Sequence, residues 1–213
     1  MKIALIGASG FAGSAILTEA LARGHEVTAL VRNPGRLEAR GGLDSIAVDV
    51  LDSQALADAL TGHDAVISAY KPALDAADVE DRFALAADAL VTAARLSGVR
   101  RVLAVGGAAT LEVAPGVKLL DTAEFPAEWR PVALGTARVL AALRAADDLE
   151  WTFLSPSAHF EPGPRTGNFR LGKDQLLVAA DGSSAISNGD YAAALLDELE
   201  QGRHLRQRFT VGY

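Results

Sequence analysis

Short apolar runs that end at glycine or at turn residues alternate along the chain with longer segments of helical apolar spacing. Such runs are typical of buried parallel strands, and the longer segments are typical of helices packed on one face. The expected strands cover residues 2–6, 26–31, 44–50, 64–69, 101–105 and 151–154. The expected helices cover residues 11–23, 53–62 with Ser53 as N-cap, 79–96, 134–146 and 189–201.

Strands that alternate with helices imply right-handed crossovers, because parallel neighbours need a connection that passes over a face of the sheet. The pattern therefore predicts an α/β fold: a doubly wound parallel sheet with helices on both faces. With 213 residues, the chain is expected to form a single domain, residues 1–213.

The alternation changes after Pro156. Residues 169–179 are expected to form two short strands or a hairpin, and residues 208–211 a last strand. We expect residues 156–213 to form a small C-terminal cap over the substrate side of the sheet, where the parallel strands end.

Composition excludes several classes of function. The formal net charge of −7 disfavours nucleic acid as a partner, because phosphate binding needs a basic surface. The chain has no cysteine, and His25, His63 and His204 show no ligand spacing, so we expect no metal site. The apolar run after Lys2 is too short for a signal peptide, and no run approaches the roughly 20 residues of a membrane span. The expected location is the cytoplasm, with no membrane partner.

Three glycines follow the first expected strand at a spacing of three: Gly7, Gly10 and Gly13. A strand that leads into a helix through such a turn places unpaired N–H groups and a positive helix end where a pyrophosphate can bind. Glycine lets the backbone turn sharply and approach the ligand closely. The alternative is an ordinary strand–helix turn. Because the motif opens a series of strand–helix units, we favour a dinucleotide site.

The stretches IGASGFAGSAI, VTALVRNP, DVLDSQAL, DAVISA, WTFLSPSAHFEPG and DYAAALLDELE carry a resemblance over nearly the whole chain. The sequence resembles the short-chain dehydrogenase/reductase superfamily, and more closely its atypical NAD(P)H-binding branch. That branch includes NmrA-like proteins, flavin reductases of the biliverdin-reductase-B type and NADH-flavin reductases. The resemblance implies a Rossmann-like fold and a nicotinamide cofactor. It implies these cofactor-binding residues: Gly7, Ser9, Gly10, Phe11, Ala12, Gly13, Arg32, Arg36, Asp49, Val50, Ser68, Ala69, Tyr70, Val105, Gly106, Pro156, Ser157 and Ala158.

Arg32 and Arg36 indicate which cofactor is preferred. In this architecture an acidic residue after the second strand binds the ribose 2′-hydroxyl of NAD, whereas arginine accommodates the 2′-phosphate of NADP. Guanidinium groups bind phosphate through two parallel hydrogen bonds. NADP(H) is therefore the expected cofactor, with NAD(H) as the alternative if these arginines are merely solvated. Asp49 is expected beside the adenine, or else as a helix cap.

Most members of the superfamily carry a Tyr-x-x-x-Lys pair that protonates a carbonyl substrate. Here the residues four positions after Tyr70 and Tyr191 are leucines, and Tyr213 is the last residue given. The usual serine after the fifth strand is also replaced, by the run GGAA at 106–109. Acid–base reduction of carbonyls is therefore disfavoured.

Hydride transfer to a flavin or quinone mainly requires that two rings be held together. We therefore predict an NADPH-dependent reductase of a planar acceptor, with flavin as a substrate and glycines 106–107 leaving room for its ring. His159 is the candidate proton donor, and Phe160, Trp129 and Phe125 are candidates for the acceptor pocket or for ordinary packing. The alternatives are a non-catalytic NAD(P) sensor of NmrA type and a reductase or epimerase with His159 or Glu124 as acid. Residues 84–94 are a candidate homodimer surface.

Overall fold

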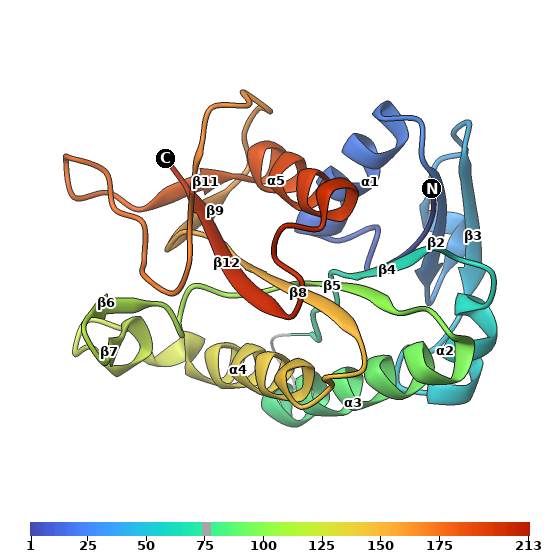
Figure 1. The fold of residues 1–213 in the computed structure, drawn as a ribbon, viewed down its shortest axis with the longest axis horizontal. Helices are drawn as coiled ribbons and strands as arrows, with labels where there is room; N and C mark the ends of the chain where they lie inside the picture. Colours follow the sequence, from blue (N-terminus) through green and yellow to red (C-terminus); the bar gives the residue numbers. More distant parts are fainter. Residues whose placement is uncertain (74–77) are drawn as a thin grey trace.

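One sheet of eight strands forms the centre of the computed structural model, which describes residues 1–73 and 78–213. The strand order is β10-β12-β8-β5-β4-β1-β2-β3, and only β10 runs antiparallel to its neighbour (Figure 1). The strands are β1 (Lys2–Ile6), β2 (Glu26–Val31), β3 (Leu43–Ala47), β4 (Ala65–Ser68), β5 (Arg101–Val105), β8 (Glu150–Ser155), β10 (Arg170–Gly172) and β12 (Gln207–Gly212). Two small two-stranded sheets pair β9 (His159–Glu161) with β11 (Ala185–Ser187), and β6 (Glu112–Ala114) with β7 (Val117–Lys118).

Helices cover both faces of the sheet (Figure 1). On one face α1 (Phe11–Ala22) packs beside α5 (Asn188–Gln201); on the other, α3 (Val79–Ser97) lies between α2 (Ser53–Leu60) and α4 (Arg130–Arg144). Tyr191 and Phe209 are buried in the first core, and Trp151 and Phe153 in the second. The expected doubly wound α/β fold is confirmed.

The chain changes its direction of travel across the sheet between β1 and β4. From β1 the strands progress outward through β2 to β3, and from β4 they progress the other way through β5, β8 and β12. All seven of these strands are parallel, so their carboxyl ends meet at one edge. Ligands of open α/β sheets bind at that edge where the strand order reverses, because the two flanking loops diverge there. The glycine turn at residues 7–13 directly follows β1 and therefore lies where the strand order reverses.

Local boundaries differ from the expected ones at β3 and α2. The third strand ends at Ala47 rather than at residue 50, which leaves Asp49 in the following loop. Ser53 is not the N-cap of α2. Asp52 is, because its Oδ1 accepts the N–H groups of Gln54 and Ala55 at 3.1 and 3.0 Å.

The C-terminal segment was predicted wrongly in two respects. Residues 169–179 form neither a hairpin nor two strands; the single strand β10 pairs with β12. Residues 156–213 are also more than a cap, because β12 is an inner strand of the main sheet and α5 completes the helix layer with α1. Between β8 and α5, β9 and β11 form a separate two-stranded sheet, whereas β10 joins the main sheet as its edge strand. The helix expected at 134–146 begins four residues earlier, where Arg130 and Pro131 form its first turn.

Within the described ranges, no helix has both the length and the apolar character needed to cross a membrane.

Candidate functional site

The turn after β1 can be formed only by glycine. Gly7 has a φ of +78°, and a Cβ atom there would lie 2.4 Å from the carbonyl oxygen of Ala69 at the end of β4. Its own carbonyl oxygen accepts the N–H of Gly10 at 2.9 Å, which closes the turn. The chain therefore leaves β1 in close contact with β4, where the order of the sheet reverses.

The helix that follows starts without a side-chain cap. Gly10 is the N-cap of α1 and offers no oxygen to the first turn, and the first backbone donor inside the helix is Ser14, to Gly10 at 2.9 Å. The N–H groups of residues 11–13 are thus left for another acceptor. A Cβ on Gly13 would lie 2.0 Å from the Gly7 oxygen, so α1 can pack this closely against the turn only with glycine at position 13. This cradle fits a pyrophosphate, for which the N–H groups and the helix dipole both favour negative charge.

Ser9, Phe11 and Ala12 complete the turn. Ser9 is exposed, Ala12 is half-buried, and the Phe11 side chain keeps 44% of its surface exposed. The Phe11 ring stands edge-on to Phe160, with centroids 4.9 Å apart. This contact joins the first turn of α1 to β9, which follows the end of β8.

Arg32 and Arg36 flank the loop after β2 at the same edge. Both are exposed, and neither forms an ion pair with any residue of the described ranges. The loop is shaped by Asn33, whose Oδ1 accepts the Gly35 N–H at 3.2 Å. Because β2 pairs with β1, this loop lies beside the loop that follows β1, and the two guanidinium groups could bind an anionic group there.

Asp49 and Val50 lie in the loop after β3. The Asp49 carboxylate is exposed and accepts the N–H of Leu51 at 3.0 Å, while Val50 packs against the core under α2. Asp49 therefore does not cap α2. Its carboxylate shapes the loop that follows β3.

The end of β4 provides the opposite wall. Ser68 pairs in register with Ile6, and the N–H of Ala69 donates to the Ile6 carbonyl at 3.0 Å. The Tyr70 ring meets Phe83 of α3 edge-on at 6.2 Å. Burial raises the pKa of the Tyr70 hydroxyl against the opposing charges of Arg82 and Arg32. Tyr70 is therefore a neutral group at this rim.

The glycines after β5 serve packing rather than open space. A Cβ on Gly106 would lie 2.3 Å from Phe153 Cε1, and one on Gly107 would lie 3.0 Å from Thr136 Oγ1. The expectation that they clear room for an acceptor ring is therefore wrong: their missing side chains face β8 and α4. Val105 is half-buried at the end of β5, and the Gly106 N–H donates to Leu154 at 2.8 Å.

Residues 156–158 continue from β8 along the same edge. The Ser157 side chain is buried and donates to the Val211 carbonyl, so only its backbone faces the site. The Ala158 N–H is already bonded to Ser184 Oγ at 3.1 Å, which leaves its carbonyl oxygen as the available group. Pro156 is buried and can offer only its carbonyl oxygen.

Ser155 is a polar residue that the sequence did not single out. Its Oγ atom is buried at the last position of β8, and no described residue bonds to it. A buried hydroxyl without a partner is uncommon in native proteins. Its place next to Pro156 puts a buried polar group at this strand end, and no local sequence pattern indicates that its hydroxyl is buried without a partner.

His159 and Phe160 point in different directions, as neighbours on a strand do. The His159 side chain is 69% exposed, and its Nδ1 lies 3.9 Å from Glu161 Oε1. Phe160 packs between Phe11 and Tyr191, with centroids 4.9 and 4.6 Å away. The histidine thus faces solvent from β9, and the phenylalanine belongs to the core under α1 and α5.

The three aromatic candidates for an acceptor pocket do not come together. Phe160 lies on the α1–α5 side, whereas Phe125 packs against a small cluster that includes Leu120 and Ala133. Trp129, just before α4, keeps 45% of its surface exposed. Glu124 is exposed on the segment leading to Trp129.

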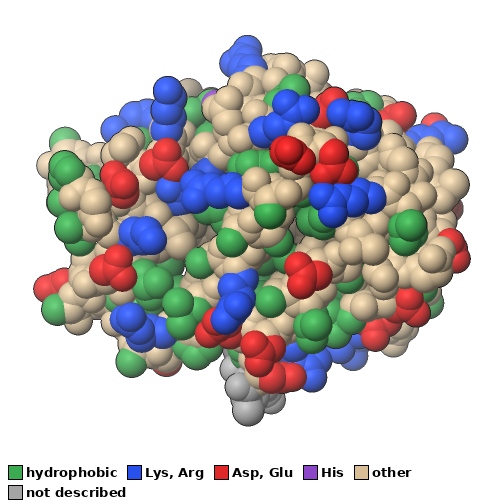
Figure 2. Space-filling model, turned by 60° about the horizontal axis from the view of Figure 1, so that its bottom comes forward, with side chains coloured by type: hydrophobic (Ala, Val, Ile, Leu, Met, Phe, Trp, Pro, Cys, Tyr) green, Lys and Arg blue, Asp and Glu red, His purple; other side chains and the backbone are tan. Residues whose placement is uncertain are grey.

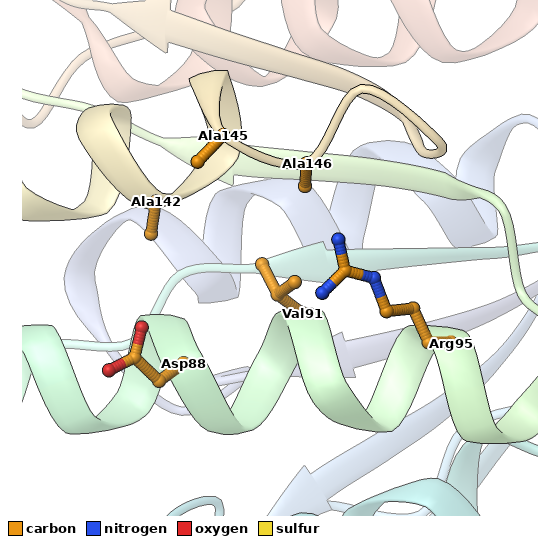
Figure 3. A pocket seen from close by; sticks show the side chains of 6 residues that line it. All are labelled: Asp88, Val91, Arg95, Ala142, Ala145 and Ala146. Atoms are coloured by element: carbon orange, nitrogen blue, oxygen red, sulfur yellow. The ribbon is translucent and has the colours of Figure 1, made fainter.

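Two surface hollows lie away from the carboxyl edge. One, of about 180 Å³, lies between α3 and α4, where Figure 3 shows its lining residues; there Arg95 is bonded to Asp148. The other, of about 390 Å³, lies near the start of β12 and is lined by Arg144, Asp147, Trp151, Lys173, Asp174, Arg206, Gln207 and Arg208. Neither contains a residue of the glycine turn. Among the described residues, no group of three or more histidine, aspartate or glutamate side chains is arranged to hold a metal ion.

Comparison with known proteins agrees with this geometry. The sequence profile of an NAD(P)H-binding family matches residues 7–202. The uncharacterised protein YwnB of Bacillus subtilis (strain 168) is 44% identical over 216 residues, covering 99% of this chain and 98% of YwnB.

Two solved structures share the fold over nearly their whole length. A "putative epimerase" from Bacteroides thetaiotaomicron is 44% identical with a TM-score of 0.92, covering 100% of this chain and 96% of the other. A "putative NADH-flavin reductase" from Streptococcus pneumoniae TIGR4 is 38% identical with a TM-score of 0.88, covering 100% and 99%. The chain is therefore a member of the NAD(P)H-binding family of oxidoreductases with a Rossmann-like fold.

Proposed function

We propose that this protein is an NADPH-dependent reductase that transfers hydride to a flavin, a quinone or a similar planar acceptor. The proposal combines an uncapped glycine cradle at the sheet reversal with two exposed arginines on the adenosine side. It also draws on the likeness to the Streptococcus pneumoniae protein described as a flavin reductase.

One observation carries the choice of acceptor: the hydroxyls of Tyr191 and Tyr213 donate hydrogen bonds within the fold, and the third tyrosine, Tyr70, has no partner lysine at the required spacing. Tyr191 is buried and donates to Leu154, and Tyr213 donates to Asp190 at 2.8 Å. Tyr70 lies against Phe83 without a lysine one helical turn away. The site thus offers no tyrosine–lysine pair for carbonyl reduction, whereas an acceptor ring needs mainly positioning.

Different residues at the carboxyl edge would bind different parts of the cofactor. The N–H groups of the first turn of α1 would hold the pyrophosphate, and Arg32 and Arg36 the 2′-phosphate. Backbone groups of residues 156–158 would orient the nicotinamide at the end of β8. Bound NADPH supplies a hydride, and the protein's contribution is to hold donor and acceptor rings in contact and keep water out.

The test is oxidation of NADPH and NADH by the purified protein with FMN, FAD, riboflavin and a set of quinones. We expect turnover with at least one of these acceptors and a preference for NADPH. NADPH binding by calorimetry without turnover of any acceptor would contradict the proposal. Equal affinity for reduced and oxidised cofactor in that case would favour a sensor of NmrA type.

A cytoplasmic location and a homodimer through α3 are further parts of this proposal. A reductase of this kind needs a supply of reduced cofactor, which the cytoplasm provides. On the face that carries α3 and α4, hydrophobic side chains are interspersed with charges of both signs (Figure 2). Sedimentation analysis of the wild type and of Leu85→Glu, whose side chain is exposed on α3, tests the dimer: the wild type should sediment as a dimer and the variant as a monomer.

A further inference from the structure

Lys71 and Trp129 meet between the loop that follows β4 and the start of α4. The Lys71 ammonium lies 5.5 Å from the centre of the Trp129 ring, within the range of a cation–π interaction. Trp129 keeps 45% of its surface exposed, and Lys71 is exposed as well. An aromatic surface and a positive charge are thus offered to solvent at the same place.

The contacts of β4 and α4 fix where this pair lies. Lys71 comes three residues after the end of β4, and its neighbour Tyr70 contacts Phe83 of α3. Trp129 is the N-cap of α4, and Thr136 on the same helix lies beside Gly107 after β5, where an added Cβ would come 3.0 Å from its Oγ1. Trp129 therefore lies about two helical turns beyond that contact, past the carboxyl ends of the strands.

Of the charged groups near Trp129, the Lys71 ammonium is the one that faces the indole ring. Glu128 and Arg130 flank Trp129 with opposite charges, and Arg130 donates to the Leu120 carbonyl at 3.2 Å. Lys71 forms no ion pair with a residue of the described ranges. Its charge is available to a ligand that also contacts the indole.

We propose that Lys71 and Trp129 select an acceptor that combines a planar ring with an anionic group. The indole would pack against the ring, and the ammonium would pair with the anion, as in a flavin that carries a phosphate. This inference rests on the proposed reductase function and narrows its acceptor from any planar ring to an anionic one.

FMN and riboflavin test the inference directly, because they share one ring system and differ by the phosphate. Binding of each flavin to the protein with bound NADP⁺ is measured by quenching of flavin fluorescence, without turnover. The wild type should bind FMN more tightly than riboflavin by about two- to fivefold, the range of an exposed ion pair. Lys71→Gln should remove this preference and leave riboflavin binding unchanged. The matched control is Lys173→Gln, an exposed lysine in the hollow near β12, which should keep the preference.

Trp129 is tested by two substitutions. Trp129→Ala should weaken both flavins by several-fold, and Trp129→Phe should restore most of the affinity, because an aromatic face is retained. Added salt should reduce the FMN preference of the wild type but not of Lys71→Gln, because screening acts on the charge pair.

An unchanged ratio of FMN to riboflavin affinity in Lys71→Gln would overturn the inference. Failure of both flavins to bind the wild type would overturn it too. Reduction of a neutral quinone would then still uphold the reductase proposal, so the two failures can be told apart. FMN binding that depends on Lys71, without NADPH oxidation, would instead refute the proposed reaction and keep the binding site.

Discussion

The phenol hydroxyl of Tyr191 donates a hydrogen bond of 2.7 Å to the carbonyl oxygen of Leu154, which also accepts the Gly106 N–H at 2.8 Å. The tyrosine has no exposed surface, and burial raises the pKa of its hydroxyl. One oxygen therefore joins α5 to the ends of β8 and β5. Tyr191 positions the strand ends and is out of reach of a substrate.

Replacement of Tyr191 by phenylalanine should affect stability more than turnover. The ring remains packed on Phe160, and the Leu154 oxygen keeps its bond to Gly106. We expect a loss of about 1 kcal/mol in the free energy of unfolding, measured in urea. NADPH turnover should change little, whereas loss of a general acid would reduce it by about a hundredfold or more. His159→Ala, at the exposed histidine, should likewise retain turnover.

Gly13→Ala should strongly weaken cofactor binding. The added Cβ would lie 2.0 Å from the Gly7 oxygen, so α1 must move away from the turn that it closes. We expect NADPH affinity to fall more than tenfold and stability by about 1–3 kcal/mol, the usual cost of overpacking. The control is Gly41→Ala, where nothing lies within 4 Å and φ is not positive. Equal NADPH affinity of both variants by calorimetry would contradict the cradle.

Arg32→Ala should shift cofactor preference. Loss of a charge-assisted contact to the 2′-phosphate costs about 1.5–3 kcal/mol, which corresponds to about ten- to a hundredfold in affinity. NADPH binding should weaken by that factor, and NADH binding should stay the same. Arg40→Ala, an exposed arginine beside the same loop, serves as the control. A parallel loss for both cofactors would assign Arg32 a structural role.

The stability contributed by Asp190 should depend on pH. Burial alone would raise the pKa of this carboxyl, but hydrogen bonds from Thr166, Gly167 and Tyr213 lower it below the ordinary 3.8. Because the pKa of this carboxyl is lower in the folded state than in the unfolded state, the ionised carboxylate stabilises the fold at pH values above the unfolded-state pKa. This stabilisation is lost as the pH falls through the folded-state pKa.

Asp190→Asn should therefore cost about 1–3 kcal/mol at neutral pH, because the amide cannot accept all of these bonds. Urea unfolding from pH 7 to pH 3 should show the gap between wild type and variant narrowing below about pH 4. A gap that is constant across that range would mean that the carboxylate charge contributes nothing.

A buried ion pair at the opposite edge of the sheet should govern stability without affecting the cofactor. Arg101 donates to Glu198 at 2.9 Å, and Glu198 also bonds His204 Nδ1 at 2.7 Å. Glu198→Ala leaves a buried guanidinium unpaired, so we expect a loss of about 3–5 kcal/mol. Arg101→Met combined with Glu198→Leu should recover most of it. NADPH affinity should be unchanged in the double variant, and a large change would show that the two edges are coupled.

Local sequence determined the strand–helix alternation and the glycine turn of this protein. A strand or helix must bury its apolar side chains whatever its place in the fold, so its apolar pattern is visible in the local sequence. The main strands and helices were therefore predicted within a few residues. The spacing of Gly7, Gly10 and Gly13 likewise reflects a steric need within one turn and the first turn of the helix after it.

Tertiary structure alone decided which distant groups meet. That β12 would enter the main sheet depends on pairing with β8, about fifty residues earlier in the chain, which no local pattern encodes. From the sequence, Gly106 was expected to leave room for an acceptor ring, but Phe153 occupies the position that its side chain would take. Lys71 reaches Trp129 only because the fold brings the residues after β4 beside the start of α4. Such contacts depend on packing between elements far apart in sequence, and therefore only the folded chain shows them.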